Sequence, residues 1–251
     1  MSAGPDVSKP NLSEPEQYWN AAGEVSYGEK MYASKDVEQH VRLGLWQVAL
    51  DIARDLGVPA KGRVLDLGCG DGAFANHSLK DYGRVDGYDL APAAIERARK
   101  EAPGEHYHYQ SADLIKFDYN LLPRYDGVFM IGILHHVKQA TPDIVAKIAQ
   151  ITDRVIVLEP NGDNLLRKAL ELTPAYKAAG EDSFRTKEVA AIFEEAGFKT
   201  RVSRRMNLFP NFTPGFVYRA LAPLEKKVET SAVLRALCTV NMFGFSKAVS
   251  A

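Results

Sequence analysis

The stretch that decides the fold is Val64-Leu65-Asp66-Leu67-Gly68-Cys69-Gly70-Asp71-Gly72. A short apolar strand over residues 63–67 runs directly into a turn rich in glycine, and a helix is expected near residues 73–81. Glycines in such a turn allow positive φ angles and let the backbone approach a ligand closely. The stretch therefore predicts a strand–turn–helix unit with a ligand-binding loop between its two elements.

Strands and helices alternate after this unit. Further strands are expected over residues 84–89, 106–110, 126–133, 154–158, 198–204 and 236–245. Helices are expected between them, including one over residues 214–229. This alternation predicts a doubly wound α/β sheet with mostly parallel strands. Ligands of such sheets bind at the carboxyl ends of the strands, where the strand order reverses.

The segment before residue 62 has a different character. Its first twelve residues are polar and resemble a disordered tail, and Ser34 is placed to cap a helix. Apolar residues then recur at intervals of three and four from Val37 to Leu56, and Gly57 ends the pattern. We expect residues 1–61 to form an N-terminal helical lid. Residues 62–251 form the main domain, with an aromatic insert near residues 207–230.

Composition limits the class of protein. The 251 residues include 31 Lys and Arg against 32 Asp and Glu, so the net charge of −1 argues against nucleic-acid binding through bulk positive charge. The two cysteines, Cys69 and Cys238, exclude a disulfide-stapled scaffold. The N-terminus lacks the apolar stretch of a signal peptide, and no apolar run is long enough to span a bilayer. We expect a cytoplasmic protein, a monomer or homodimer, without a nucleic-acid or membrane partner.

The acidic residues around the glycine loop indicate its ligand. Gly68, Gly70 and Ala73 also fit the relaxed dinucleotide-binding pattern, which would make the protein an oxidoreductase. A pyrophosphate at this loop would face Asp66 and Asp71 at close range, whereas an ammonium group would be attracted. S-adenosylmethionine carries an ammonium group and no phosphate. Asp89 ends the second strand, where a carboxylate accepts ribose hydroxyls, and Asp113 follows the third strand, where it is placed to accept from an adenine amino group.

Four ordered motifs carry a family resemblance: VLDLGCGDG, GYDLAPAAIERAR, QSADL and YDGVFMIGILHHV. Together they resemble the motifs of class I S-adenosylmethionine-dependent methyltransferases over residues 62–204. The resemblance implies a seven-stranded sheet whose last strand is antiparallel, and S-adenosyl-L-methionine as cofactor. It implies that cofactor contacts come from ten residues: Asp66, Gly68, Cys69, Gly70, Asp89, Leu90, Asp113, Leu114, Met130 and Ile131. Ala91 stands where the family often has a helix-capping serine.

Three residues on the acceptor side are candidates for a general base. His135 and His136 follow the fourth strand, and Glu159 ends the fifth. A histidine with a pKa near neutrality suits the removal of a proton from a methyl acceptor. The alternatives are that one histidine only hydrogen-bonds to backbone and that Glu159 caps the following helix. The sequence does not choose between the histidines.

Aromatic residues in two segments are candidates for closing the site. Tyr18, Trp19, Tyr27 and Tyr32 belong to the predicted lid. Phe209 and Phe212 belong to the insert, which also contains prolines and is suited to forming an apolar pocket wall. The alternatives are that these residues pack against the sheet, form a dimer contact or belong to the ordinary core.

The absence of certain motifs narrows the range of possible methyl acceptors. The Asn-Pro-Pro-Tyr and Asp-Pro-Pro-Tyr patterns of nucleic-acid base methyltransferases are absent after the fourth strand. Asp163-Asn164 matches part of a catechol-type metal site, but the first acid of that site is missing, so we expect no metal. The sequence thus indicates methyl transfer to an oxygen or nitrogen of a small, partly apolar molecule. A methyltransferase for a macromolecule and a catalytically silent cofactor-binding protein remain alternatives.

Overall fold

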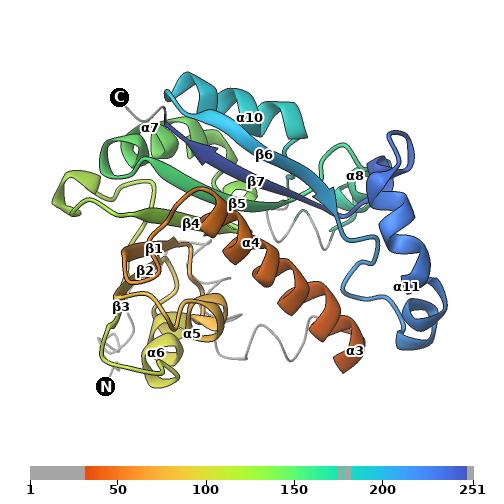
Figure 1. Cartoon of the computed structure of the whole chain (residues 1–251), viewed down its shortest axis with the longest axis horizontal. Coiled ribbons are helices and arrows are strands. Elements are labelled where there is room, and N and C mark those ends of the chain that lie inside the picture. The colour runs from red at the N-terminus through yellow and green to blue at the C-terminus, as the bar shows by residue number, and fades with distance from the viewer. Residues whose placement is uncertain (1–31, 175–176, 178–181, 248–251) are drawn as a thin grey trace, which may run out of the picture.

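The computed structural model describes residues 32–174, 177 and 182–247, and these are drawn as coloured ribbon in Figure 1. The predicted lid residues Tyr18, Trp19 and Tyr27 lie outside this range. Within it, no helix has both the length and the apolar character needed to cross a membrane.

A seven-stranded sheet forms the centre of the molecule, in the order β3-β2-β1-β4-β5-β7-β6. All strands are parallel except β7, which runs antiparallel to both β5 and β6. This confirms the predicted fold, with the reversal of strand order at β1 and β4. The strands are β1 (Arg63–Leu67), β2 (Arg84–Asp89), β3 (Tyr107–Ser111), β4 (Gly127–Ile131), β5 (Arg154–Pro160), β6 (Lys199–Met206) and β7 (Val240–Ser246).

Two strand boundaries differ from the sequence expectation for local reasons. β7 begins at Val240 rather than Ala236, because Leu234–Leu237 forms a 3-10 turn, η5. β5 continues to Pro160, because its last residues still pair with β7 as far as Val240. The extension places Glu159 inside the sheet rather than in a loop beyond it.

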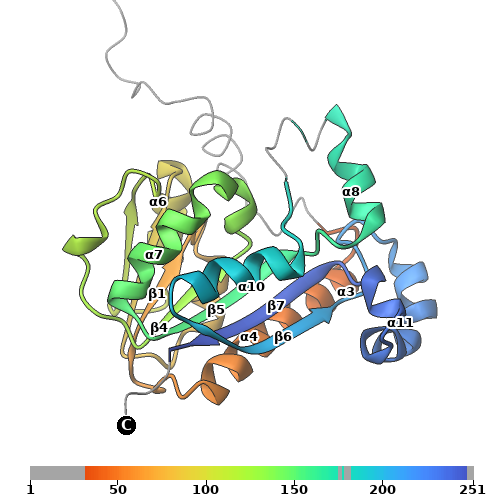
Figure 2. The same ribbon diagram turned by 90° about the horizontal axis from the view of Figure 1, so that it is seen from above.

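Helices cover both faces of the sheet (Figures 1 and 2). On one face lie α4 (Gly44–Asp55), α5 (Ala73–Ser78) and α6 (Pro92–Lys100), whose apolar side chains form one buried cluster with the sheet. On the other lie α7 (Thr141–Ile151) and α10 (Thr186–Glu195), which contribute to a second cluster. Each helix buries one apolar stripe, as the spacing of three and four residues predicts.

The described part of the predicted lid is built into the core. A single helical rod contains α3 (Lys35–Glu38), a π-turn η1 (Gln39–Leu43) and α4. The Ser34 hydroxyl caps the rod by accepting from the Val37 amide, and Gly57 follows its end at φ +77°. Val37 and Ile52 are fully buried in the same cluster as the strands. The rod is therefore a layer of the fold, because removing it would expose this apolar surface.

Two helical segments, which we call the additions, follow the carboxyl ends of β5 and β6. The first is α8 (Leu165–Glu171), and the second is α11 (Gly215–Thr230) with η5, which lies between β6 and β7. α11 rests against the N-terminal rod, where His40 Nε2 lies 2.5 Å from Glu225 Oε2. Both additions lie at the right-hand end of Figure 1.

Candidate functional site

The glycine loop between β1 and α5 has the predicted open conformation. Gly68 has φ +78°, and a Cβ there would lie 2.4 Å from Ile133 Cγ1, so only glycine fits. Gly70 has φ +53°, and a Cβ there would meet open space. Cys69 is buried between them, and burial raises the pKa of its thiol well above the usual value, so it acts as a small apolar filler. The surface beside Gly70 is therefore free for a ligand.

Asp66 lies under this loop with an unsatisfied carboxyl group. Its side chain is only 1% exposed, and neither carboxyl oxygen has a hydrogen-bond partner among the described residues. Burial, together with the charge of Asp89, raises the pKa of Asp66 to about 8. Buried polar atoms are normally satisfied, so a pair of such oxygens marks a place for a donor or cation from outside the chain.

Asp89 holds the loop and the next helix together. One oxygen accepts from the Gly70 amide and the other from the Ala91 amide, each at 2.9 Å. The second bond fixes the Ala91 backbone just before α6, whose N-cap residue has no side chain able to accept a hydrogen bond. Burial raises the pKa of Asp89 in spite of these backbone donors. Each carboxylate oxygen can accept more than one hydrogen bond, so the group retains capacity for hydroxyls.

Asp113 and its neighbours are less enclosed. The Asp113 carboxylate accepts from the Ile115 amide at 3.0 Å and forms an ion pair with Lys116. Partial burial opposes ionisation, but the hydrogen bonds from Lys116 and Ile115 outweigh it and lower the pKa of Asp113. Leu114 is buried, and Leu90, partly exposed, accepts from Ser111 Oγ through its carbonyl.

The end of β4 places one predicted contact residue in the core. Met130 is fully buried in the cluster on the α7 face, so its side chain packs against the sheet and only its backbone can meet a ligand. Ile131 is partly exposed on the opposite face. Gly132 follows with φ +71°, and a Cβ there would meet open space, as at Gly70.

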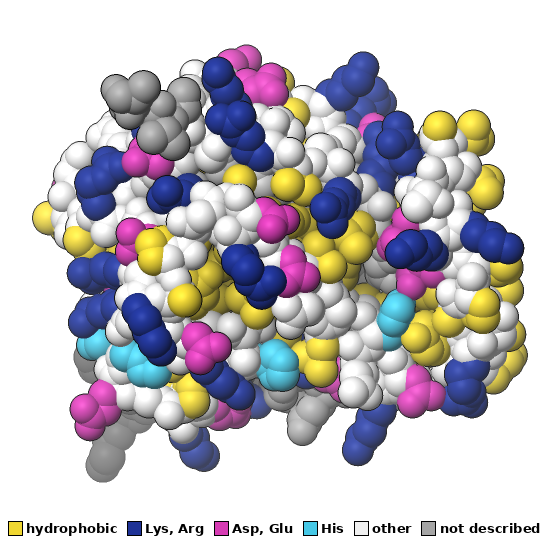
Figure 3. Space-filling view, in the orientation of Figure 1, with side chains coloured by type: hydrophobic (Ala, Val, Ile, Leu, Met, Phe, Trp, Pro, Cys, Tyr) yellow, Lys and Arg dark blue, Asp and Glu magenta, His cyan; other side chains and the backbone are white. Residues whose placement is uncertain are grey.

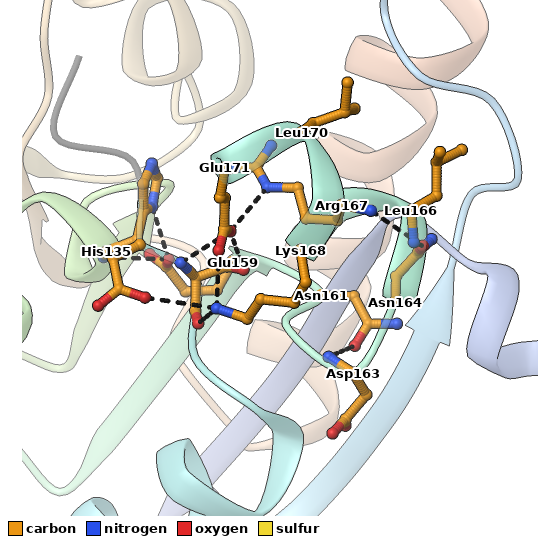
Figure 4. Close-up of polar contacts among 12 residues, drawn as sticks. His135, Glu159, Asn161, Asp163, Asn164, Leu166, Arg167, Lys168, Leu170 and Glu171 are labelled. Carbon is orange, nitrogen blue, oxygen red and sulfur yellow. Dashed lines mark hydrogen bonds and ion pairs between the residues drawn. The ribbon is translucent and has the colours of Figure 1, made fainter. Parts of the chain in front are cut away.

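Glu159 and His135 form a buried pair across neighbouring strand ends (Figure 4). His135 Nδ1 lies 2.7 Å from Glu159 Oε2, and the carboxylate also accepts from the Leu134 amide at 2.7 Å and the His135 amide at 3.3 Å. A carboxylate can only accept, so Nδ1 carries the proton. Glu159 therefore caps the turn η3 (Leu134–His136) after β4 rather than the helix after its own strand.

The His136 ring lies against that of His135, tilted by 45° with ring centroids 3.9 Å apart. Burial, together with the charges of His135 and Arg167, lowers the pKa of His136 to about 2. The ring is therefore neutral at every pH at which the protein would work. A base of such low pKa has little driving force for accepting a proton.

The remaining predicted residues have different surroundings. Tyr32 is partly buried beside Arg42, whose guanidinium lies 6.0 Å from the ring centroid. Phe209 was expected to line a pocket, but it is buried in the core and lies edge-on to Tyr218 at 5.2 Å. Phe212, three residues later, is exposed. The insert therefore divides its aromatic residues between the core and the surface.

Asp163 and Asn164 are held by protein donors. Asp163 accepts from the Thr186 hydroxyl and from Arg205, each at 2.6 Å, and Asn164 caps α8. Among the described residues, no three His, Cys, Asp or Glu side chains are grouped so that they could hold a metal ion.

Arg42 is a candidate that the sequence analysis missed. Its guanidinium lies 4.9 Å from the Trp46 ring centroid, and Trp46 contacts Phe74 on α5, just after the glycine loop. Arg42 pairs with Glu38, but its Nε is buried without a partner in the described part of the chain. The i, i+4 spacing of Arg42 and Trp46 was a signal for this stack.

Residues 64–155 match the family model of the methyltransferase domain. They are a class I methyltransferase domain. This family uses S-adenosylmethionine, and the matched residues run from β1 into β5 and include the glycine loop, Asp66 and Asp89.

Two curated relatives match part of the chain. An uncharacterised methyltransferase of Schizosaccharomyces pombe is 30% identical over 86 residues, which are 34% of this chain and 28% of the relative. An aklanonic acid methyltransferase of a Streptomyces species is 50% identical over 52 residues, 19% of this chain and 24% of the relative. The aligned residues span about a quarter of the length of these relatives.

A solved structure shows the same fold over almost the whole chain. Magnesium protoporphyrin IX methyltransferase from Synechocystis, with bound S-adenosylhomocysteine, has a TM-score of 0.63 and 16% identity. The match covers 93% of this chain and 98% of that one. At this identity the likeness supports the fold alone, including the helices that surround the methyltransferase domain.

Proposed function

We propose that the protein transfers a methyl group from S-adenosylmethionine to an oxygen or nitrogen of a small, partly apolar molecule. The observation that carries the cofactor part is Asp66, a buried carboxyl group with no hydrogen-bond donor among the described residues. The ammonium group of the cofactor's methionine part supplies both positive charge and donors. A pyrophosphate supplies neither, which disfavours the dinucleotide alternative.

The residues present fit this cofactor. Gly68 and Gly70 shape the loop, Asp66 faces the methionine part and Asp89 accepts from the ribose hydroxyls. Asp113 is a weaker candidate for the adenine, because it is partly exposed and already binds Lys116. We add Arg42, whose guanidinium suits the methionine carboxylate. When bound, the cofactor supplies an activated methyl group on a sulfonium.

The chain's own groups would position the acceptor and hold its proton. We propose His135 as the base where the acceptor needs one, because the hydrogen bond from Nδ1 to Glu159 leaves Nε2 as the acceptor nitrogen. Glu159 orients the imidazole and stabilises its charged form, as a carboxylate does in other histidine pairs. Glu159 is a positioning residue here, because its carboxylate is fully buried and already occupied by donors.

The acceptor class rests on the surroundings of the site. Apolar side chains are exposed on both additions beside it, and the relatives with named acceptors include an aklanonic acid methyltransferase, whose acceptor is a small molecule. These features favour a small, partly apolar acceptor over a macromolecule. A cytoplasmic location and a monomeric or homodimeric state complete the proposal.

Titration calorimetry with S-adenosylmethionine tests the cofactor assignment. We expect binding by the wild type and a dissociation constant raised about 100-fold in Asp89→Ala, because the variant loses both the ribose acceptor and the bond to Gly70. Asp81→Ala, at an exposed aspartate in the turn before β2, is the matched control. An absence of wild-type binding, or unchanged affinity in Asp89→Ala, would overturn the proposal. A panel of small-molecule acceptors with a product assay then tests the transfer.

A further inference from the structure

Bulky apolar side chains are exposed at one end of the molecule. Of the twelve large hydrophobic residues that are exposed in the described part of the chain, ten lie in residues 165–172 and 212–237. These two segments, which we call the apolar end, contain α8, α11 and η5. Phe216 and Val233 are 71% and 79% exposed. Figure 3 shows apolar side chains along the right-hand edge of the molecule, where α11 lies. Concentrated exposure of this kind marks a contact surface.

The charges of α11 are divided between its two sides. Both acidic residues point into the protein: Glu225 accepts from the Leu208 amide and lies against His40, and Glu229 accepts from the Asn207 amide. The basic residues Lys226 and Lys227 are exposed. The outer side of α11 therefore presents apolar and cationic side chains and no carboxylate.

α8 repeats this arrangement. The Glu171 carboxylate is buried and binds Arg167 and Lys168, which hold the polar side of the helix against the protein. Leu165 and Leu166 are exposed, and Figure 4 shows Leu166 and Leu170 pointing away from this ionic network. α8 is thus an amphipathic helix that turns its charged side to the protein and exposes its leucines, which suits an apolar environment beyond the described residues.

The two helices belong to one surface. The Asn164 side chain at the start of α8 donates to the Leu237 carbonyl of η5 at 2.9 Å. η5 follows α11 and contributes Val233, Leu234 and the exposed Arg235. The segment that begins with α8 and the segment of α11 and η5 are therefore in contact with each other.

We propose that the apolar end docks on the surface of a lipid bilayer that contains anionic lipids. Phe216, Leu224 and Val233 enter the boundary between headgroups and acyl chains, and Lys226, Lys227 and Arg235 face the headgroups. Charge complementarity selects this occupant over a second copy of the chain. A two-fold contact through this surface would place like cationic groups against each other.

Docking of this kind differs from spanning a membrane. The lack of a long apolar run in the sequence argues against a helix that spans a membrane, but an interfacial helix needs only one apolar side. α8 and α11 follow the carboxyl ends of β5 and β6, the edge that also carries Asp66 and His135. The bilayer would therefore lie next to the candidate site. The test of this inference is separate from that of the proposed function, because binding to lipid is measured without methyl transfer.

Vesicle flotation with the full chain tests the proposal. We expect binding to vesicles of phosphatidylglycerol and phosphatidylcholine, weaker binding to phosphatidylcholine alone, and loss of the difference at high salt. Phe216→Asp with Leu224→Asp should lower the affinity about tenfold or more. Leu121→Asp, at an exposed leucine on η2 (Tyr119–Leu121) outside the apolar end, should leave it unchanged.

A second variant separates docking from folding. Lys226→Glu with Lys227→Glu alters only exposed side chains, and should lower affinity for the anionic vesicles about tenfold while leaving affinity for neutral ones unchanged. Absence of binding to either vesicle, or equal binding by all variants, would overturn the proposal. A stable dimer in solution that Phe216→Asp disperses would also overturn it, in favour of a second copy.

Discussion

Asp66 and Glu159 are two buried carboxyl groups at the same edge of the sheet with opposite surroundings. Asp66, near the end of β1, has no hydrogen-bond partner among the described residues. Glu159, near the end of β5, accepts from two backbone amides and from His135. A buried carboxylate either finds donors or takes up a proton. The fold satisfies Glu159 by itself and leaves Asp66 for a bound molecule.

The difference divides the site into two halves with different tasks. The half at β1 and β2 is electrostatically incomplete until a ligand with positive charge is present. The half at β4 and β5 is organised in advance, because Glu159 fixes the turn and the imidazole together. Changes in the first half should therefore act mainly on cofactor binding, and changes in the second half on stability and turnover.

The largest effect is expected from Glu159→Ala. The change leaves the Leu134 amide, the His135 amide and His135 Nδ1 without their common acceptor, and each buried donor costs about 1 kcal/mol or more. We expect the free energy of unfolding to fall by about 3 kcal/mol, as measured by urea denaturation. Glu195→Ala, at an exposed position on α10, is the control and should change it by less than about 0.5 kcal/mol.

Measurements of turnover distinguish two roles of Glu159, the orientation of the His135 imidazole and the stabilisation of the fold. Glu159→Gln keeps the size of the side chain and one acceptor oxygen, so it should fold, while kcat falls about 100-fold because the imidazole loses its charged partner. The dissociation constant for S-adenosylmethionine should stay within about twofold. A Glu159→Ala variant as stable as the wild type would remove the distinction between the two halves.

An intermediate effect is expected from Asp66→Asn, and it depends on pH. The pKa of Asp66 is raised from 3.8 to about 8 by burial and by Asp89. The folded state therefore holds more protons than the unfolded state between about pH 4 and pH 8, and the free energy of unfolding falls as pH rises through this window. Between about pH 5 and pH 8 this fall is about 3 kcal/mol for Asp66, and the variant should lack it.

Cofactor binding gives the second measurement on the same variant. An ammonium group beside Asp66 favours the carboxylate, so binding near neutral pH should release up to one proton, seen as a heat that depends on the ionisation enthalpy of the buffer. Asp66→Asn should bind about tenfold more weakly and release none. Proton release that persists in the variant would assign the titrating group elsewhere.

The sequence predicted the first half of the site better than the second for a physical reason. Asp66, Gly70 and Asp89 are placed by strand ends and by one tight turn, which are local features. The pairing of Glu159 with His135 depends on β4 and β5 being neighbours, which the sequence does not state. The antiparallel β7 was implied by the family resemblance and not by a local pattern, and the order of the strands was not predicted.

The sequence also does not predict which of two similar, closely spaced side chains is buried. Phe209 and Phe212 have the same side chain and similar neighbours, yet one is in the core and the other is exposed. Met130 and Ile131 alternate across the sheet, so only the placement of helices decides which one faces the cofactor side. Residues 35–55 pose the same problem, because an amphipathic helix does not reveal in its sequence whether its apolar face is covered permanently.

The smallest effect is expected from Asp113→Asn, which tests how far the first half extends. Asp113 is partly exposed and already bound by Lys116 and the Ile115 amide, so solvent screens its charge and an amide oxygen can replace one acceptor. We expect the dissociation constant for S-adenosylmethionine to rise less than about threefold by calorimetry, far less than in Asp89→Ala. A rise equal to that of Asp89→Ala would mean that Asp113, which is partly exposed and ion-paired, contributes as much as the more enclosed Asp89, and enclosure would no longer explain why the two ends of the cofactor site differ.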